Sequence, residues 1–229
     1  MRHRIFVETI EPSVTVTGDE FHHSVRVVRV RAGEEVELFD KTGRVAKGIV
    51  ESLERDEAVI RVVEEIPSRE SKLDLHLAMA IINLEKFELV LQKATELGVK
   101  SFIPLVTERI EMRRERYAGK LDRWRKIVLE AVKQSGRSLV PPIEEPAEFE
   151  EVIQRPGNRL LFDADAEPSP RPASLDAVTL LIGPEGGWSE DELEAARHHG
   201  CGFARMGPRR LRAETAAIVA CAILAERYD

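Results

Sequence analysis

The sequence has only two cysteines, Cys201 and Cys221, and neither belongs to a CxxC pair. This scarcity argues against a disulfide framework and against a structural zinc site, so each cysteine is expected to be a small buried apolar residue. The two histidine pairs, His22-His23 and His198-His199, lack ligand spacing with other metal-binding residues. The sequence therefore predicts no metal site.

Long hydrophobic runs are also lacking. No segment approaches roughly eighteen consecutive apolar residues, and the opening stretch MRHRIFVETI has neither a long apolar core nor a small-residue cleavage site. We therefore expect no membrane anchor and no secretory signal, which makes the cytoplasm the default location. Hydrophobic residues make up 43% of the 229 residues and charged residues 33%, as in a globular protein with one large domain or two modest ones.

Net positive charge is lacking too, because 41 acidic residues outweigh 34 basic ones and give a net charge of −7. A nucleic acid responds to the local field and not to this sum. The segment from Arg109 to Arg137 holds ten basic and four acidic residues, a local charge of +6. Taken alone, this cluster is equally compatible with a solvated helix face. A second cluster, Arg205, Arg209, Arg210 and Arg212, favours an anionic partner.

The hydrophobic pattern changes between two parts of the chain. Residues 1–66 contain short alternating stretches such as EEVELF and AVIRVVEEI, separated by glycines, which predict a small β-barrel or sandwich. A polar linker, PSRESK, follows at 67–72. From residue 73 to 229, apolar strands such as LDLHLAMAI and AVTLLIGP alternate with helical stretches such as LEKFELVLQKATELG. This alternation predicts an α/β domain with a mainly parallel sheet.

Two Gly-Pro turns end apolar runs near the C-terminus, in IGPEGGWSEDE and MGPRRLRAETAA. A phosphate loop would offer a lysine and then a serine or threonine. Here Glu185 puts a carboxylate in the first turn, and Pro184 removes an amide donor. The turn therefore suits a neutral or cationic ligand. Because ligands collect outside the carboxyl ends of parallel strands, we expect both turns to line one pocket.

The helices beside these turns carry two further signals. Ser189 followed by Glu192 has the spacing of a capping box at the start of a helix. The last helix, expected over 213–228, is apolar nearly all round. Such a helix must be buried on most sides, by its own domain or by a second subunit.

These two turn motifs resemble the cofactor loops of the RsmE family of 16S rRNA uridine-N3 methyltransferases, in the SPOUT superfamily. The resemblance extends over almost the whole chain, through EKFELVLQKATELGVKSFIPLVTER, the segment from Arg123 to Pro141, HRIFV, and HHSVRVVRVRAGEEVELFD. One departure is Asn83, where the family often has lysine or arginine before the helix. A role for a basic residue at that position is therefore not carried over.

The resemblance implies a fold and a cofactor. It implies a PUA-like, RNA-binding β-barrel at 1–66, a linker at 67–72, and a SPOUT methyltransferase domain at 73–229 with a deep trefoil knot. It also implies a homodimer that binds S-adenosyl-L-methionine, whose cationic sulfur suits the carboxylate, and releases S-adenosylhomocysteine. The expected cofactor-binding residues are Phe162, Ile182, Gly183, Pro184, Glu185, Gly186, Gly187, Met206, Gly207, Leu211, Arg212, Thr215 and Ala216.

Methylation of uridine N3 needs in-line approach of the nitrogen to the methyl group and loss of the N3 proton. A carboxylate such as Glu185 or Glu214 would serve as base, or an arginine would stabilise charge on the uracil oxygens. We rank Arg212 first as a catalytic residue, then Glu214, then Arg109. Glu214 is equally explained as a first-turn carboxylate favoured by the helix dipole.

The implied partner is 16S rRNA in the assembled small ribosomal subunit, with a decoding-region uridine as target. The expected RNA contacts are Arg2, Arg4, His22, His23, Arg26, Arg29, Arg113, Arg114 and Arg123. Two alternatives stay open. The chain is a non-catalytic RNA-binding module for ribosome assembly, or it is a nucleotide-dependent enzyme that uses the glycine turns for phosphate. The missing Lys-Ser/Thr pair weighs against the second.

Overall fold

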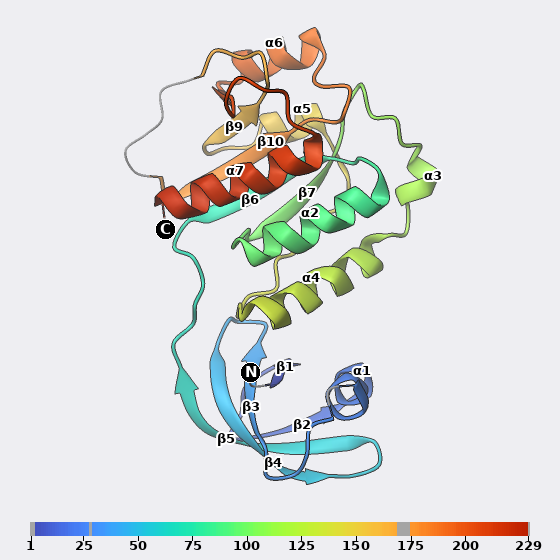
Figure 1. Ribbon diagram of the computed structural model, residues 1–229, viewed down its shortest axis with the longest axis vertical. Coiled ribbons are helices and arrows are strands. Elements are labelled where there is room, and N and C mark those ends of the chain that lie inside the picture. The colour runs from blue at the N-terminus through green and yellow to red at the C-terminus, as the bar shows by residue number, and fades with distance from the viewer. Residues whose placement is uncertain (1–2, 28, 169–174, 229) are drawn as a thin grey trace. The chain divides into compact units, whose positions relative to one another are not determined.

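The computed structural model describes residues 3–27, 29–168 and 175–228, the side chains of residues 26 and 27 excepted (Figure 1). The chain divides into two compact units. The N-terminal unit contains residues 1–70 and 132–140, and the C-terminal unit contains residues 71–131 and 141–229. The division falls within helix α4 (Leu121–Ser135), so a segment from the middle of the sequence belongs to the N-terminal unit.

A curled five-stranded sheet forms most of the N-terminal unit. Its strands are β1 (His3–Val7), β2 (Ser13–Thr17), β3 (Glu35–Asp40), β4 (Val45–Leu53) and β5 (Glu57–Ile66), in the order β1-β3-β4-β5-β2. Only β1 and β3 pair in parallel. In β2 the alternation of the sequence buries Val14 and Val16 and exposes the residues between them. The predicted small N-terminal β-domain is thus confirmed. Between β2 and β3 lie α1 (Gly18–Phe21) and a π-helix (His22–Val27).

A buried ion pair holds the segment 132–140 within the N-terminal unit. Arg137 Nη2 donates to Glu70 Oε2 over 2.7 Å, and the amides of Ser138 and Leu139 donate to Glu70 Oε1 over 2.8 and 3.0 Å. Arg4 donates to two carbonyl oxygens of the same segment. Burial by itself raises the pKa of Glu70, but the bonds from Arg137 and the two amides outweigh it, so the pKa lies below its ordinary value.

The C-terminal unit contains a six-stranded sheet in which every neighbouring pair is parallel. Its strands are β6 (Asp74–Ala80), β7 (Ser101–Val106), β8 (Ala147–Glu148), β9 (Arg159–Phe162), β10 (Ala177–Ile182) and β11 (Gly202–Ala204), in the order β11-β9-β10-β6-β7-β8. The predicted parallel sheet is therefore confirmed. The trefoil knot stays a prediction.

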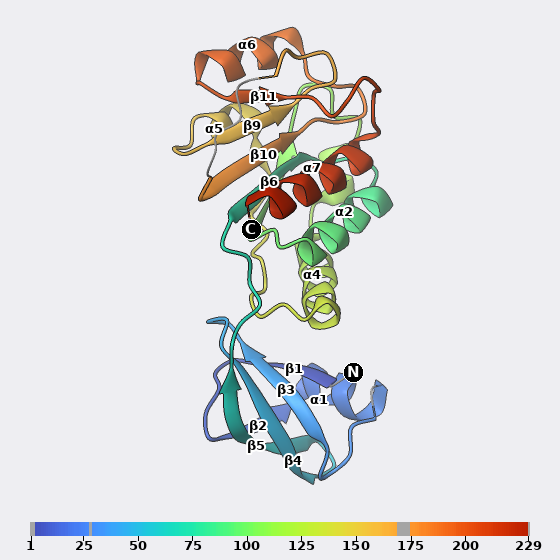
Figure 2. The same cartoon turned by 60° about the vertical axis from the view of Figure 1, so that its left-hand side comes forward.

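Helices cover both faces of this sheet (Figure 2). One face packs against α5 (Phe149–Ile153) and α6 (Glu190–His198), where Phe149 and Leu193 meet Leu161 and Leu181 of the strands. On the other face, α7 (Ala213–Tyr228) packs against β6 and β10, and α2 (Leu84–Glu96) lies beside α7. Trp124 of α4 packs against Phe87 of α2. A short helix, α3 (Arg114–Tyr117), precedes α4. Because α2 and α7 lie side by side, residues far apart in sequence meet at their N-terminal ends.

The ends and faces of these helices explain several sequence features. Asn83, which departs from the family pattern, is the N-cap of α2, and its side chain accepts from the amide of Glu85 over 3.0 Å. One stripe of α7 is buried, whereas Ile223 on another face is 39% exposed. Both cysteines are free and buried, as predicted, and burial raises the pKa of Cys221 to about 12. Within the described residues, no helix has the length and apolar character needed to cross a membrane.

Candidate functional site

A pocket of about 540 Å³ lies where β9, β10 and β11 end. Its lining comes from the loops that follow these three neighbouring strands, together with Arg109 from the loop after β7. All of these strands are parallel, so their carboxyl ends meet at one edge of the sheet. The two Gly-Pro turns, which are more than twenty residues apart in sequence, therefore line the same pocket.

Most of the residues expected to bind the cofactor line this pocket. They are Phe162, Ile182, Gly183, Pro184, Glu185, Gly186, Gly187, Met206, Leu211, Arg212 and Ala216. Gly207 and Thr215 are exposed and lie outside the lining. Of the expected catalytic residues, Arg109 and Arg212 line the pocket, and Glu214 lies beside it.

The first turn is shaped by a close approach between Gly183 and Trp188. A Cβ atom on Gly183 would lie 2.9 Å from Cε2 of the indole, so no larger residue fits without displacing the ring. The indole Nε1 donates to the carbonyl of Phe162 at the end of β9 over 3.0 Å, and the ring packs against Phe149. The amide of Gly187 donates to the carbonyl of Pro184 over 3.0 Å. The turn is thus fixed to the strand beside it.

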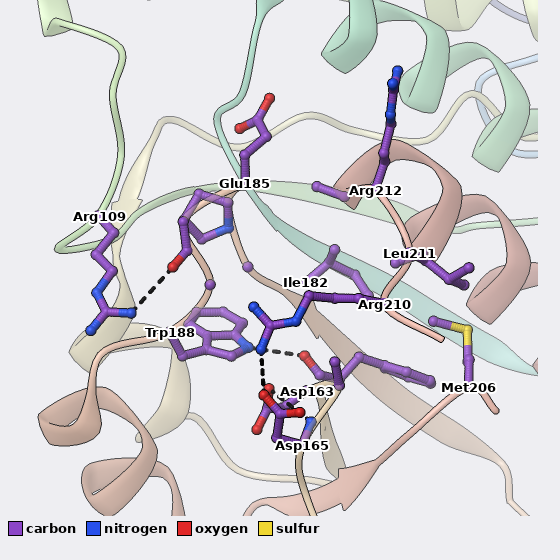
Figure 3. Close-up of a pocket in the computed structure, with 18 of the residues that line it drawn as sticks. Arg109, Asp163, Asp165, Ile182, Glu185, Trp188, Met206, Arg210, Leu211 and Arg212 are labelled. Atoms are coloured by element: carbon purple, nitrogen blue, oxygen red, sulfur yellow. Dashed lines mark hydrogen bonds and ion pairs between the residues drawn. The ribbon is translucent and has the colours of Figure 1, made fainter. Parts of the chain in front are cut away.

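The predicted capping box is present at the start of α6. Ser189 Oγ accepts from the amide of Glu192, and Glu192 Oε2 accepts from the amide of Ser189 over 2.8 Å. The other oxygen of Glu192 accepts from the amide of Glu108 over 3.0 Å. Arg109, the next residue, donates to the carbonyl of Gly186 over 3.2 Å (Figure 3). These bonds tie the loop after β7 to the first turn.

An ion pair lies beside the second turn, and the sequence analysis missed its carboxylate, which belongs to the loop after β9. Arg210 forms an ion pair with Asp165, and both side chains are largely exposed (Figure 3). Asp163 and Asp165 follow β9 and line the pocket, as does Arg209. The sequence does indicate that these two carboxylates lie near the pocket, because RLLFDADA places both of them directly after a predicted strand. The same strand-end argument that located the two turns applies to them.

A charged cluster lies on the side of the pocket next to α2. The Lys86 ammonium lies 3.6 Å from a carboxylate oxygen of Glu185 and 3.6 Å from one of Glu214. The side chains of Glu185 and Arg212 both project away from Trp188 and Met206 (Figure 3). The sequence analysis singled out the carboxylates and Arg212, but not Lys86. Nothing in the local pattern of α2 indicates where this lysine points.

The residues expected to contact RNA are found in different surroundings. Arg113, Arg114 and Arg29 are exposed, whereas Arg123 is engaged with Glu88 of α2 and its side chain is 65% exposed. The Arg4 side chain is 9% exposed, and its guanidinium is bonded within the N-terminal unit. His22 is exposed and His23 is half-buried. Arg2 and the side chain of Arg26 lie outside the described residues.

The pocket combines an apolar floor with charges of both signs. Phe162, Ile182, Met206 and Leu211 supply apolar surface, and arginines and carboxylates surround it. Of the described residues that line it, none is a lysine. Among those residues whose placement is described, no group of three or more potential ligands is arranged to hold a metal ion. The arrangement suits an organic ligand that has an apolar ring and a polar, charged end.

Two family models match the chain. Residues 69–225 match the model of an RNA methyltransferase domain, and residues 16–63 match that of an RNA methyltransferase PUA domain. The chain thus contains an RNA methyltransferase domain preceded by an RNA methyltransferase PUA domain.

Related proteins narrow the class further. The chain is 30% identical to the ribosomal RNA small subunit methyltransferase E of Bacillus subtilis, over 95% of this chain and 91% of the relative. It is 33% identical to the protein of the same name from Synechocystis, over 97% of this chain and 77% of the relative. The chain belongs to the ribosomal RNA small subunit methyltransferase E family.

Solved structures resemble the whole chain. The enzyme of this family from Neisseria gonorrhoeae, bound to S-adenosyl methionine, aligns with a TM-score of 0.91 at 30% identity and covers 100% of this chain and 98% of its own. A putative methyltransferase from Legionella pneumophila, in complex with the same cofactor, aligns with a TM-score of 0.90 at 30% identity. The alignment covers 99% of this chain and 98% of the Legionella chain.

Proposed function

We propose that this protein transfers a methyl group from S-adenosylmethionine to small-subunit ribosomal RNA. Its product is a uridine methylated at N3 in the decoding region of 16S rRNA, formed on the assembled small subunit. The observation that carries the proposal is the pocket that the two Gly-Pro turns form at the ends of parallel strands. Membership of the family and the bound cofactor in two relatives support it.

The pocket residues fit the proposed cofactor. When bound, S-adenosylmethionine supplies an electrophilic methyl group on a positively charged sulfur. A cavity of about 540 Å³ falls within the usual range for small-molecule sites, about 300–1,000 Å³. Phe162, Ile182 and Leu211 would hold the adenine ring on apolar surface, and the carboxylates beside them would favour a cationic ligand over a phosphate.

The side chains at the α2 edge of the pocket would act on the target base. Uridine N3 must lose its proton, and the charge that remains spreads over the ring oxygens O2 and O4. Arg212 would stabilise that charge, because its planar guanidinium donates two hydrogen bonds side by side. Glu214 is the second candidate and Arg109 is the third, and one of the two carboxylates Glu185 and Glu214 would accept the N3 proton. The base must leave its stack to reach them, because pairing covers N3.

The N-terminal part would bind RNA. We propose a PUA-like RNA-binding domain at 1–66, a linker at 67–72 and the methyltransferase domain at 73–229. Arg29 of the PUA-like domain is exposed, as are Arg113 and Arg114 of the methyltransferase domain, and all three are candidates for phosphate contacts. We further propose a cytoplasmic homodimer, in which a second subunit covers the part of α7 around Ile223 that is still exposed.

The decisive experiment is transfer of labelled methyl from S-adenosylmethionine to small ribosomal subunits that lack the modification, followed by mass spectrometry of the 16S rRNA. We expect one methylated uridine with the label on N3. Calorimetry with the cofactor and with ATP tests the alternatives. Binding of ATP alone would indicate a nucleotide-dependent enzyme, and RNA binding with neither ligand would indicate a non-catalytic assembly module.

A further inference from the structure

Lys86 joins the two turns of the pocket through their carboxylates. Its ammonium lies 3.6 Å from Oε1 of Glu185 in the first turn and 3.6 Å from Oε1 of Glu214 at the start of α7. The three residues come from α2, the loop after β10 and α7. One cation is thus shared by two anions, which leaves a net negative charge beside the pocket.

The position of Lys86 in its helix is electrostatically unfavourable. Lys86 is the third residue of α2, in the first turn, where the helix dipole disfavours a positive charge. A carboxylate at this position would instead be stabilised by the dipole. The local structure of α2 therefore gives no reason for a lysine here. The carboxylates of Glu185 and Glu214, which face Lys86, do give a reason for a positive charge at this position.

The two carboxylates differ in their access to a ligand. The Glu214 side chain is 13% exposed, and its second oxygen is buried without a hydrogen-bond donor among the described residues. Removing Lys86 would leave this buried carboxylate without the ion pair seen here. The Glu185 side chain is 38% exposed and lines the pocket. Glu214 therefore anchors the ammonium, and Glu185 is the carboxylate that a bound base can reach.

We infer that Lys86 is a positioning residue for the proposed reaction, held by Glu214 and holding Glu185, and that Glu185 is the acceptor of the uracil N3 proton. This inference rests on the proposed function. In the step concerned, the N3–H bond breaks, its proton moves to a carboxylate oxygen of Glu185, and the electron pair stays on N3. The ammonium, 3.6 Å away, holds the Glu185 carboxylate, which projects to the same side as Arg212 (Figure 3). Arg212 would stabilise the resulting anion.

The test compares Lys86→Met, Lys86→Arg, Glu185→Gln and the double variant Lys86→Met/Glu185→Gln in single-turnover methyl transfer at saturating cofactor and RNA. Lys93→Met is the matched control, because Lys93 lies on the same helix, is similarly exposed and forms an ion pair with Glu96 of that helix, outside the pocket lining. We expect Lys86→Met to slow transfer by at least about tenfold, part of the ~10²–10⁴-fold that a positioned base supplies. Lys86→Arg should recover most of the rate, and Lys93→Met should match the wild type.

The double variant distinguishes positioning from a separate effect. If Lys86 acts through Glu185, the double variant is no slower than Glu185→Gln alone. The inference would be overturned if the two single substitutions slowed methyl transfer by factors that multiply in the double variant. It would also be overturned if Lys86→Met transferred methyl at the wild-type rate. Calorimetry supplies a readout apart from turnover, with a cofactor affinity in Lys86→Met expected within about threefold of the wild type. A large loss of affinity with an unchanged rate would make Lys86 a brace for the cofactor turn instead. Failure of the wild type to methylate would refute the proposed function itself.

Discussion

Replacement of Gly183 by alanine tests how tightly the first turn is built. The new Cβ would lie 2.9 Å from Cε2 and 3.2 Å from Nε1 of the Trp188 indole, so the ring must shift by about half an ångström. The indole is 6% exposed, packs against Phe149 and donates to the carbonyl of Phe162. A shift of the ring therefore either disturbs these contacts or pushes the ring into the pocket, which Trp188 lines.

The cost follows from these contacts. Overpacking of a dense core costs about 1–3 kcal/mol, and loss of the indole hydrogen bond adds about 1 kcal/mol. We expect Gly183→Ala to lower the free energy of unfolding by roughly 2–4 kcal/mol, or the melting temperature by roughly 4–16 °C in a chain of this size. Because Trp188 and Gly183 both line the pocket, cofactor affinity should fall as well.

The assay is urea unfolding together with near-ultraviolet circular dichroism and calorimetric titration of the cofactor. Gly187→Ala is the control in the same turn, because a Cβ there meets no atom within 4 Å but the backbone has a φ of 70°. It isolates backbone strain, which costs about 1–2 kcal/mol, and should leave the aromatic dichroism unchanged. A Gly183→Ala variant with the stability and dichroism of the wild type would refute the reasoning.

Three further predictions follow from the charged residues. Glu70→Gln should lower the free energy of unfolding by about 3–5 kcal/mol, because the buried Arg137 guanidinium loses the negative charge of Glu70. The pKa of Glu70 in the folded protein lies below its ordinary value. The ionised carboxylate therefore stabilises the wild type fully at pH values above that ordinary value, and this stabilisation is lost as pH falls through the pKa of the folded state. Urea unfolding at a series of pH values should show this acid-dependent loss of stability in the wild type but not in Glu70→Gln. The double variant Arg113→Ala/Arg114→Ala should weaken RNA binding and reduce its salt slope by about one to two, and an unchanged slope in filter binding would make the segment a solvated face. Arg212→Lys should bind the cofactor nearly as well as the wild type but transfer methyl slowly in single turnover; full activity would remove Arg212 from the mechanism.

Local sequence patterns were enough to predict the secondary structure around the site. The stretches that read as strands and helices from 73 onward form them, and the capping box at Ser189 and Glu192 is present. The reason is that hydrophobic period, caps and turn residues act within a few positions of one another. Since parallel strands present their carboxyl ends at one edge, the sequence also indicated that the loops after two strands would meet.

Only the tertiary structure decided which distant side chains meet. Residues 132–140 belong to the N-terminal unit because Glu70 and Arg4 bind their backbone and Arg137, and no periodicity reports such a contact. Lys86 meets Glu185 and Glu214 because β6 and β10 are neighbours in the sheet and α2 packs beside α7. Strand order and helix packing are set by burial of whole faces, so they bring together charges that lie about a hundred residues apart in the chain.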